Sequence, residues 1–97
     1  MMTRTGVGAV LCAAHRSVEG QLHGHTWEIT AWFPSGADAF ELQRLLVGFL
    51  AQWDHAELPA HLSRGEHLAA AIGQSLSMCV QVDVSRPPER IFARWHL

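Results

Sequence analysis

Three histidines stand close together in the stretch AAHRSVEGQLHGHTWEI. His23 and His25 flank a single glycine, and His15 precedes that pair by eight residues. Residues two apart in a β-strand point to the same side, and a hairpin would bring His15 beside them. Three converging imidazoles suit Zn²⁺ with the fourth position left to water or substrate, whereas a structural zinc normally fills all four positions. The spacing therefore predicts an open, catalytic metal site.

Other interpretations of the same residues remain open at this point. The three histidines could be polar surface residues of a loop. They could also belong to a metal-dependent hydrolase of unrelated substrates, because a metal-bound water can supply hydroxide. Glu19, four residues before His23, is either a general base or a solvated loop carboxylate, since a carboxylate acts as a base near neutral pH only when it is buried.

The composition indicates one small domain over residues 1–97. Apolar residues make up 48% of the chain and charged residues 16%, which is more apolar material than so small a monomer can easily bury. We therefore expect a homo-oligomer in which a second face is covered. The formal net charge of −2, without a basic run, argues against a nucleic-acid partner.

The cysteines and the hydropathy pattern predict a cytoplasmic protein. Cys12 and Cys79 form no C-x-x-C motif and no disulfide framework,. The apolar run from Gly6 to Ala14 is at the lower limit for a secretion signal and carries two glycines, so we interpret it as a strand. No segment is long enough to span a membrane.

Hydrophobic spacing predicts the elements that position the histidines. Residues 5–14 and 25–33 read as strands, the second with clean alternation, and residues 15–24 read as the loop between them,. Asp38 and Glu41 form a capping box that opens a helix. Its apolar positions recur at helical spacing, at Leu42, Leu45, Leu46, Phe49, Leu50 and Trp53,.

The second half of the chain is predicted to contain a helix followed by two strands. Ser63 and Glu66 form another capping box, and the helix that follows runs through Leu76,. Residues 78–84 and 90–97 read as strands around the turn SRPPE,. The order ββααββ predicts an α+β fold, a four-stranded antiparallel sheet with two helices on one face. Both faces of the sheet carry apolar residues, so we expect the helix-free face to meet other subunits.

Three motifs together resemble one known family. The segments AAH, LHGHTW and WDHAEL are similar to those of the 6-pyruvoyl-tetrahydropterin synthase and 6-carboxytetrahydropterin synthase family, and the similarity extends from Leu11 to about Val84. The resemblance implies the tunnelling fold, in which two stacked trimers form a barrel-shaped hexamer. It also implies zinc held by His15, His23 and His25, and 7,8-dihydroneopterin triphosphate as substrate.

The resemblance implies a reaction as well. In this family zinc holds the side-chain oxygens of the substrate, a base removes a carbon-bound proton, and triphosphate leaves or the side chain is cleaved. The base is a cysteine four residues before H-G-H, supported by an Asp-His pair. That pair corresponds to Asp54 and His55, which we expect to act across a subunit boundary, while the cysteine position is Glu19. Cys12 does not replace it, because it lies three residues before His15 on the strand.

Three positions depart from the family pattern and make this a divergent member. Glu19 replaces the cysteine. A branch of the family that carries a glutamate cleaves the side chain to give 6-hydroxymethyldihydropterin for folate synthesis, but its glutamate falls where this chain has Gly20. Val84 takes the place of the glutamate that grips the pterin, with Asp83 beside it. The threonine-rich start of the second helix has become Arg64-Gly65.

Two functions of different class follow. The first is a zinc-dependent lyase-type enzyme for a reduced pterin, in which Glu19, Asp54 and His55 handle protons. The second is a non-catalytic, metal-carrying oligomer that binds a ligand without transforming it, as the missing cysteine and Val84 suggest. Asp54 could also be a turn residue. Three further histidines are most simply surface residues, namely His61, His67 and His96.

Overall fold

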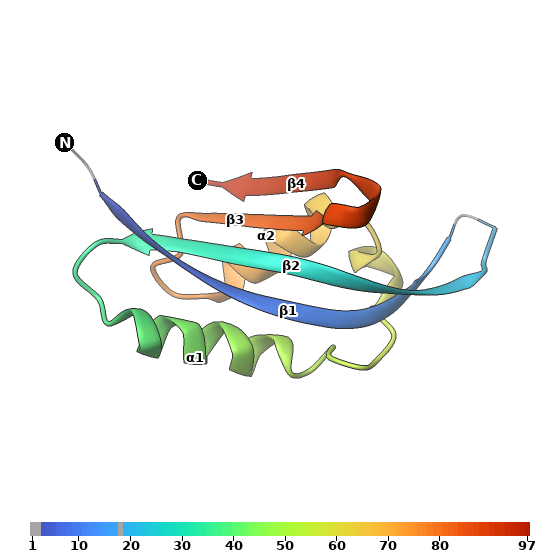
Figure 1. Ribbon diagram of the computed structural model, residues 1–97, viewed down its shortest axis with the longest axis horizontal. Coiled ribbons are helices and arrows are strands. Elements are labelled where there is room, and N and C mark those ends of the chain that lie inside the picture. Colours follow the sequence, from blue (N-terminus) through green and yellow to red (C-terminus); the bar gives the residue numbers. More distant parts are fainter. Residues whose placement is uncertain (1–2, 18) are drawn as a thin grey trace.

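The computed structural model describes residues 3–17 and 19–97. Its elements are β1 (Arg4–Arg16), β2 (Leu22–Pro34), α1 (Ala39–Leu50), α2 (Gly65–Ser75), β3 (Gln81–Arg86) and β4 (Ile91–His96), with short 3₁₀ turns at Ala60–Leu62 and Pro87–Glu89. The strands form one antiparallel sheet in the order β1-β2-β3-β4, and both helices cover the same face (Figure 1). The predicted α+β fold is confirmed.

The hairpin of β1 and β2 is longer than the sequence predicted. The two strands pair along their whole length, from Arg4 opposite Pro34 to Arg16 opposite Leu22. The expected loop over residues 15–24 is therefore wrong at both ends. Continued pairing satisfies backbone groups that a loop would leave to water, and the hairpin projects beyond the shorter strands β3 and β4 (Figure 1).

The core lies between the sheet and the two helices. Alternate residues of β1 and β2 point into it, and the same alternation buries one side of β3. The side chains with almost no exposed surface are Leu11, Trp27, Ile29, Phe33, Leu46, Leu58, Leu68, Ile72, Val82 and Val84. None of the described helices is long and apolar enough to cross a membrane.

Helix α1 begins at the predicted cap, and fewer of its apolar residues are buried than the helical spacing suggested. The Asp38 carboxylate accepts a hydrogen bond from the Phe40 backbone N–H at 2.9 Å, which caps the first turn. The buried positions repeat every four residues, at Leu42, Leu46 and Leu50. Leu45 falls outside that stripe and is 56% exposed, so the prediction that it packs in the core is wrong.

Helix α2 starts without the predicted capping box. Arg64 is the N-cap residue and gives no side-chain cap, while Glu66 pairs with the Arg64 guanidinium at 2.7 Å. Ser63 belongs instead to the end of the preceding 3₁₀ turn. Met78 also departs from expectation, because it lies before β3 with a positive φ of 68° and is exposed.

Candidate functional site

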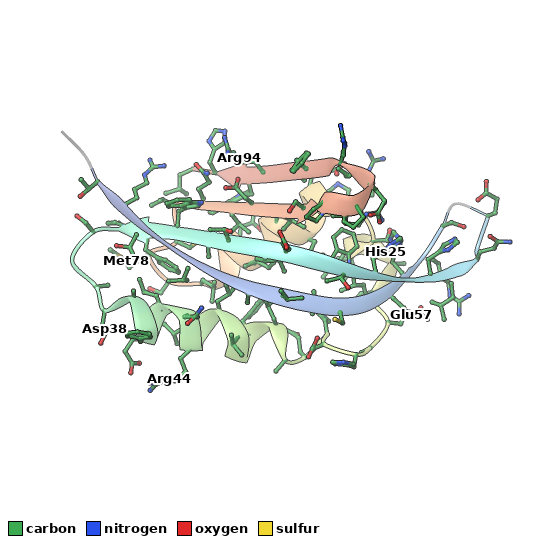
Figure 2. The ribbon with its side chains drawn as sticks, in the orientation of Figure 1. His25, Asp38, Arg44, Glu57, Met78 and Arg94 are labelled. Atoms are coloured by element: carbon green, nitrogen blue, oxygen red, sulfur yellow. The ribbon has the colours of Figure 1, made fainter. Side chains whose placement is uncertain are left out.

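His15, His23 and His25 come together at the hairpin end of the sheet. His15 lies directly opposite His23 in the β1–β2 pairing, and His25 follows on the same side of β2, next to the buried ring of Trp27. The ring centres of His15 and His25 are 4.7 Å apart, those of His23 and His25 6.1 Å, and those of His15 and His23 6.4 Å. Figure 2 shows His25 at this end of the sheet.

One of these separations matches a three-histidine metal centre, and the two that involve His23 are wider. Zn–N bonds are about 2.0–2.1 Å long, which places the ring centres of neighbouring ligands in a tetrahedral site about 5 Å apart. The His15–His25 distance is already close to that value. His23 is the exposed member of the cluster, so its ring is free to turn toward the other two.

Two of the three rings have an oxygen atom close to Nδ1. The Nδ1–H of His15 donates to the backbone carbonyl oxygen of Ser63 at 2.9 Å. Nδ1 of His25 lies 3.3 Å from the Glu89 carboxylate. A ring that donates from Nδ1 presents the lone pair of Nε2, and such partners are typical of metal-binding histidines. His15 therefore leaves Nε2 available to an ion, and His25 has an acceptor beside Nδ1 that could hold it in the same state.

The surroundings of His25 keep its ring neutral. Burial lowers the pKa of His25, the charges of Arg86 and His15 lower it further, and Glu89 opposes the shift. A neutral imidazole is the form that binds a metal. The Arg86 side chain is only 14% exposed, and its guanidinium lies 5.2 Å from the centre of the Trp27 ring.

Sequence reasoning missed the groups that orient the histidines. Ser63 contributes its backbone carbonyl, which carries no signal in the sequence. Arg86 and Glu89 lie in the SRPPE turn, which was interpreted only as a chain reversal. Pairing of β2 with β3 brings that turn to the histidines, so only the sheet topology could have pointed to these two residues.

Asp54 and His55 form a pair within one chain. The Asp54 carboxylate is 3.0 Å from His55 Nδ1 and also accepts the Cys12 backbone N–H at 3.1 Å. That backbone hydrogen bond is the main reason that the pKa of Asp54 is lowered, with the His55 ring adding to it and slight burial opposing it. His55 has a positive φ of 60°, the left-handed conformation in which chains often leave a helix.

Cys12 lies next to this pair rather than next to the histidine cluster. Potential ligand atoms of Cys12, Asp54 and His55 all lie within 4.8 Å of one another. Cys12 lies three residues before His15 along the strand, which separates it from the histidine cluster. The chain after α1 returns to β1 at Cys12, where the His55 backbone N–H donates to the Cys12 carbonyl at 2.6 Å, and no sequence pattern indicates this contact.

An open hollow of about 510 Å³ lies beside Cys12 and His55. Its lining includes His25 from the histidine cluster and His55 from the pair, with Cys12, Gly24 and Thr26 between them. Gly24 has open space where a side chain would stand. Cys12 and Thr26 lie directly opposite each other in the hairpin, whereas His25 lies opposite the buried Ala13 and points to the other side of the sheet. A small molecule in this hollow would therefore face Cys12, Thr26 and His55, with the three-histidine cluster on the other side of the strands.

The remaining predicted residues take other positions. Glu19 is exposed in the hairpin turn, where its carboxylate is solvated. Val84 points into the core, opposite Ile29, so it takes no part in a surface site. Asp83 lies on the opposite face and accepts from Arg94 at 2.6 Å and from the Trp32 indole at 3.1 Å.

The surface histidines and the second-helix start also have clear places. As predicted, three histidines are exposed, namely His61, His67 and His96. Arg64-Gly65 opens α2, and a side chain at Gly65 would come within 3.2 Å of Ala93. Close packing of α2 against β4 therefore favours glycine there.

Comparisons with known proteins identify the fold. No protein-family model matches the chain, and a search of curated proteins gives no match. Among solved structures, the chain is similar to the 6-pyruvoyl tetrahydropterin synthase of Caenorhabditis elegans, with a TM-score of 0.72 and 15% sequence identity, over 100% of this chain and 96% of that one. The chain therefore has the fold of that synthase along its whole length.

Proposed function

We propose that this protein is a zinc-dependent, lyase-type enzyme that acts on 7,8-dihydroneopterin triphosphate or a related reduced pterin. The observation that carries the proposal is the cluster of His15, His23 and His25, in which Nδ1 of His15 donates to Ser63 and Nδ1 of His25 lies beside the Glu89 carboxylate. The fold supports it, because a 6-pyruvoyl tetrahydropterin synthase shares it over the full chain.

In this proposal the three histidines hold the metal, and the residues that contact their rings keep the rings in place. Zinc bound there would polarise the side-chain oxygens of the substrate and acidify its hydroxyl groups. The Ser63 carbonyl holds the Nδ1–H of His15, and the Glu89 carboxylate lies 3.3 Å from Nδ1 of His25. Burial of Arg86 beside Trp27 keeps a positive charge close to the cluster, where it would attract an anionic substrate.

Proton transfer is assigned to Asp54, His55 and Glu19. Asp54 accepts from Nδ1–H of His55, which leaves His55 Nε2 free to remove a proton from a carbon of the substrate. Loss of that proton with departure of triphosphate breaks a carbon–oxygen bond, and cleavage of the side chain breaks a carbon–carbon bond. Glu19 is the second candidate base, in the position that the related family gives to cysteine.

We propose further that the active form is a homo-oligomer, a hexamer built as a dimer of trimers. Asp54, His55 and Glu19 are all exposed in the single chain. Catalytic carboxylates and imidazoles are usually partly desolvated, and a neighbouring copy would provide that. Assembly would also place Glu19, at the projecting end of the hairpin, near the site of another subunit.

A second candidate is a non-catalytic, metal-carrying protein that binds a ligand of the same kind. Val84 favours it, because the position corresponding to the pterin-gripping glutamate is buried in the core. The exposed position of Glu19 points in the same direction. This candidate keeps the histidine cluster and the fold but has no role for His55 as a base.

Turnover separates the two candidates. Zinc-loaded protein is incubated with 7,8-dihydroneopterin triphosphate, and products are followed by chromatography and by release of triphosphate. The enzyme proposal predicts turnover that falls by about 10²-fold or more in His55→Ala, the range typical of a lost general base. Glu19→Gln tests the second base in the same assay. Pterin binding without any turnover in the wild type would support the binding protein instead.

A further inference from the structure

We infer that Cys12, Asp54 and His55 form a second metal site, separate from the three histidines, for a thiophilic divalent cation such as Zn²⁺. Their potential ligand atoms all lie within 4.8 Å of one another. The set joins a thiol from β1 to a carboxylate and an imidazole from the segment after α1, so it depends on tertiary structure and not on a local sequence motif.

Backbone hydrogen bonds hold the two segments in register at the ligands themselves. The Cys12 N–H donates to the Asp54 carboxylate at 3.1 Å, and the His55 N–H donates to the Cys12 carbonyl at 2.6 Å. Two more bonds continue along the edge of β1, from the Ala14 N–H to the Ala56 carbonyl and from the Leu58 N–H to the Ala14 carbonyl. A site whose ligand segments are already paired needs little ordering when an ion binds.

The unusual backbone of His55 supports the same interpretation. Its φ of 60° is in the left-handed region, which non-glycine residues rarely adopt and which is often found at functional sites. In this conformation the His55 ring reaches the Asp54 carboxylate at 3.0 Å. The ring is 79% exposed, so it can rotate toward an ion without disturbing the core.

The donor set selects the class of ion. Sulfur and imidazole nitrogen favour Zn²⁺ and similar transition metals, whereas Mg²⁺ and Ca²⁺ prefer oxygen ligands alone. Around a tetrahedral zinc, sulfur and nitrogen ligands are about 3.5 Å apart. The present separations, all within 4.8 Å, therefore need to close by about 1.3 Å at most. The fourth position would face the hollow beside Cys12 and Thr26, where water or a small ligand fits.

Metal binding here does not depend on pterin chemistry. Its consequence does rest on the proposed function, because an ion held by His55 and Asp54 would withdraw both from proton transfer. The second site would then act as a brake at high metal concentration. Binding at the three histidines and binding at Cys12 also differ in ligand type, which makes them separately measurable.

Cobalt(II) distinguishes the two sites, because only the proposed second site contributes a thiolate. Metal-free full-length protein is titrated with Co²⁺ without oxygen, and the near-ultraviolet thiolate-to-cobalt charge-transfer band is recorded with the total bound metal. We expect the band to rise to saturation in the wild type. It should disappear in Cys12→Ser and persist in Cys79→Ser, the matched control at the buried second cysteine.

Two further variants keep the result decisive. His55→Ala, at an exposed side chain, should weaken cobalt binding at the thiolate by at least about tenfold, which covers the case that Cys12→Ser does not fold. His23→Ala should lower the amount of bound metal yet leave the charge-transfer band.

A wild type without the band, or a band that survives Cys12→Ser, would overturn the inference. So would loss of the band in His23→Ala, since the thiol would then share the histidine site. The band does not report pterin turnover, so either proposal can fail alone.

Discussion

Two imidazoles of the cluster, His15 and His25, have an oxygen atom beside Nδ1. For His15 it is a backbone carbonyl oxygen, and for His25 it belongs to the Glu89 carboxylate. A carboxylate partner holds the ring in place and also strengthens its basicity toward a metal. The partner of His15 is a backbone carbonyl, which a substitution does not remove. The partner of His25 is the Glu89 side chain, which a substitution can remove.

Replacing Glu89 should therefore weaken zinc binding. We expect Glu89→Ala to lower zinc affinity by about 10- to 100-fold, the usual effect of losing an orienting carboxylate, as measured by competition with a chromophoric chelator. Glu66→Ala is the matched control, because Glu66 pairs with Arg64 on an exposed surface. Equal affinity in the two variants would show that Glu89 does not orient a metal ligand.

His25 should make the stability of the metal-free protein depend on pH. Burial, Arg86 and His15 lower the pKa of His25 in the folded state, against the opposing charge of Glu89. The unfolded chain therefore binds the proton more readily. The contribution of neutral His25 to the stability of the folded protein is complete above the pKa of histidine in the unfolded chain, about 6.5. It is lost as the pH falls through the lower pKa that His25 has in the folded protein.

Urea unfolding between about pH 5 and pH 8 checks this. The free energy of unfolding of the wild type should fall on the acid side, and His25→Gln should show a smaller fall over the same window. A variant with the same acid slope as the wild type would mean that His25 titrates alike in the folded and unfolded states.

The sequence predicted the members of the site better than their partners. Spacing in H-G-H placed His23 and His25 on one side of a strand, and the hairpin added His15. The Asp54–His55 pair came from a resemblance, and its contact with Cys12 came only from the structure. Pairing across the sheet edge joins residues that are 42 positions apart, and no local pattern records such a contact.

At the scale of the elements, the two helices each contain one glycine, and the two glycines differ in the space around them. A methyl group at Gly73 in α2 would overlap the indole of Trp95 on β4. Gly48 in α1 has open space around the same position. Helix propensity alone favours alanine at both places, so packing decides the sign of each substitution.

We expect Gly48→Ala to stabilise the protein by about 0.5–1 kcal/mol and Gly73→Ala to destabilise it by about 1–3 kcal/mol, as overpacking does. Chemical denaturation of the two variants measures both effects. A smaller side chain at position 95, in Trp95→Leu, should recover part of the loss in Gly73→Ala. Stabilisation by Gly73→Ala would show that α2 lies farther from β4 than described.

The order and type of the elements could be predicted, but several of their ends could not. Hydrophobic alternation identified β2, and the Asp38 cap fixed the start of α1. The hairpin extends to Arg16 and Leu22 because backbone pairing continues through polar residues that carry no hydrophobic signal. The start of α2 shifted because Ser63 ends the 3₁₀ turn in a helical conformation, so the extended N-cap position falls on Arg64.

For the whole molecule, the apolar surface is consistent with the proposed assembly. Phe92 on β4 is 72% exposed and lies on the face that the helices leave open, since its neighbour Ala93 contacts Gly65 of α2. Isolated apolar residues on a surface are ordinary. A small chain with this composition and an exposed aromatic residue on the last strand is nonetheless expected to bury more area by association.

Phe92→Glu should therefore shift the protein toward smaller species, because a charge at the centre of an apolar contact has no partner. Light scattering coupled to size-exclusion chromatography reports the mass in solution. Phe40→Glu, at an equally exposed phenylalanine on α1, is the matched control and should leave the mass unchanged. A wild type that runs as a monomer at all concentrations would remove the assembly from the proposal.

The central claim is that His15, His23 and His25 share one zinc ion and leave it an open coordination position. Anomalous diffraction at the zinc absorption edge, from crystals of the metal-loaded protein, tests this directly. We predict an anomalous peak within about 2.0–2.1 Å of Nε2 of all three rings, with no fourth protein ligand. Rings that stay apart with no peak between them, or a fourth protein ligand on the ion, would contradict it.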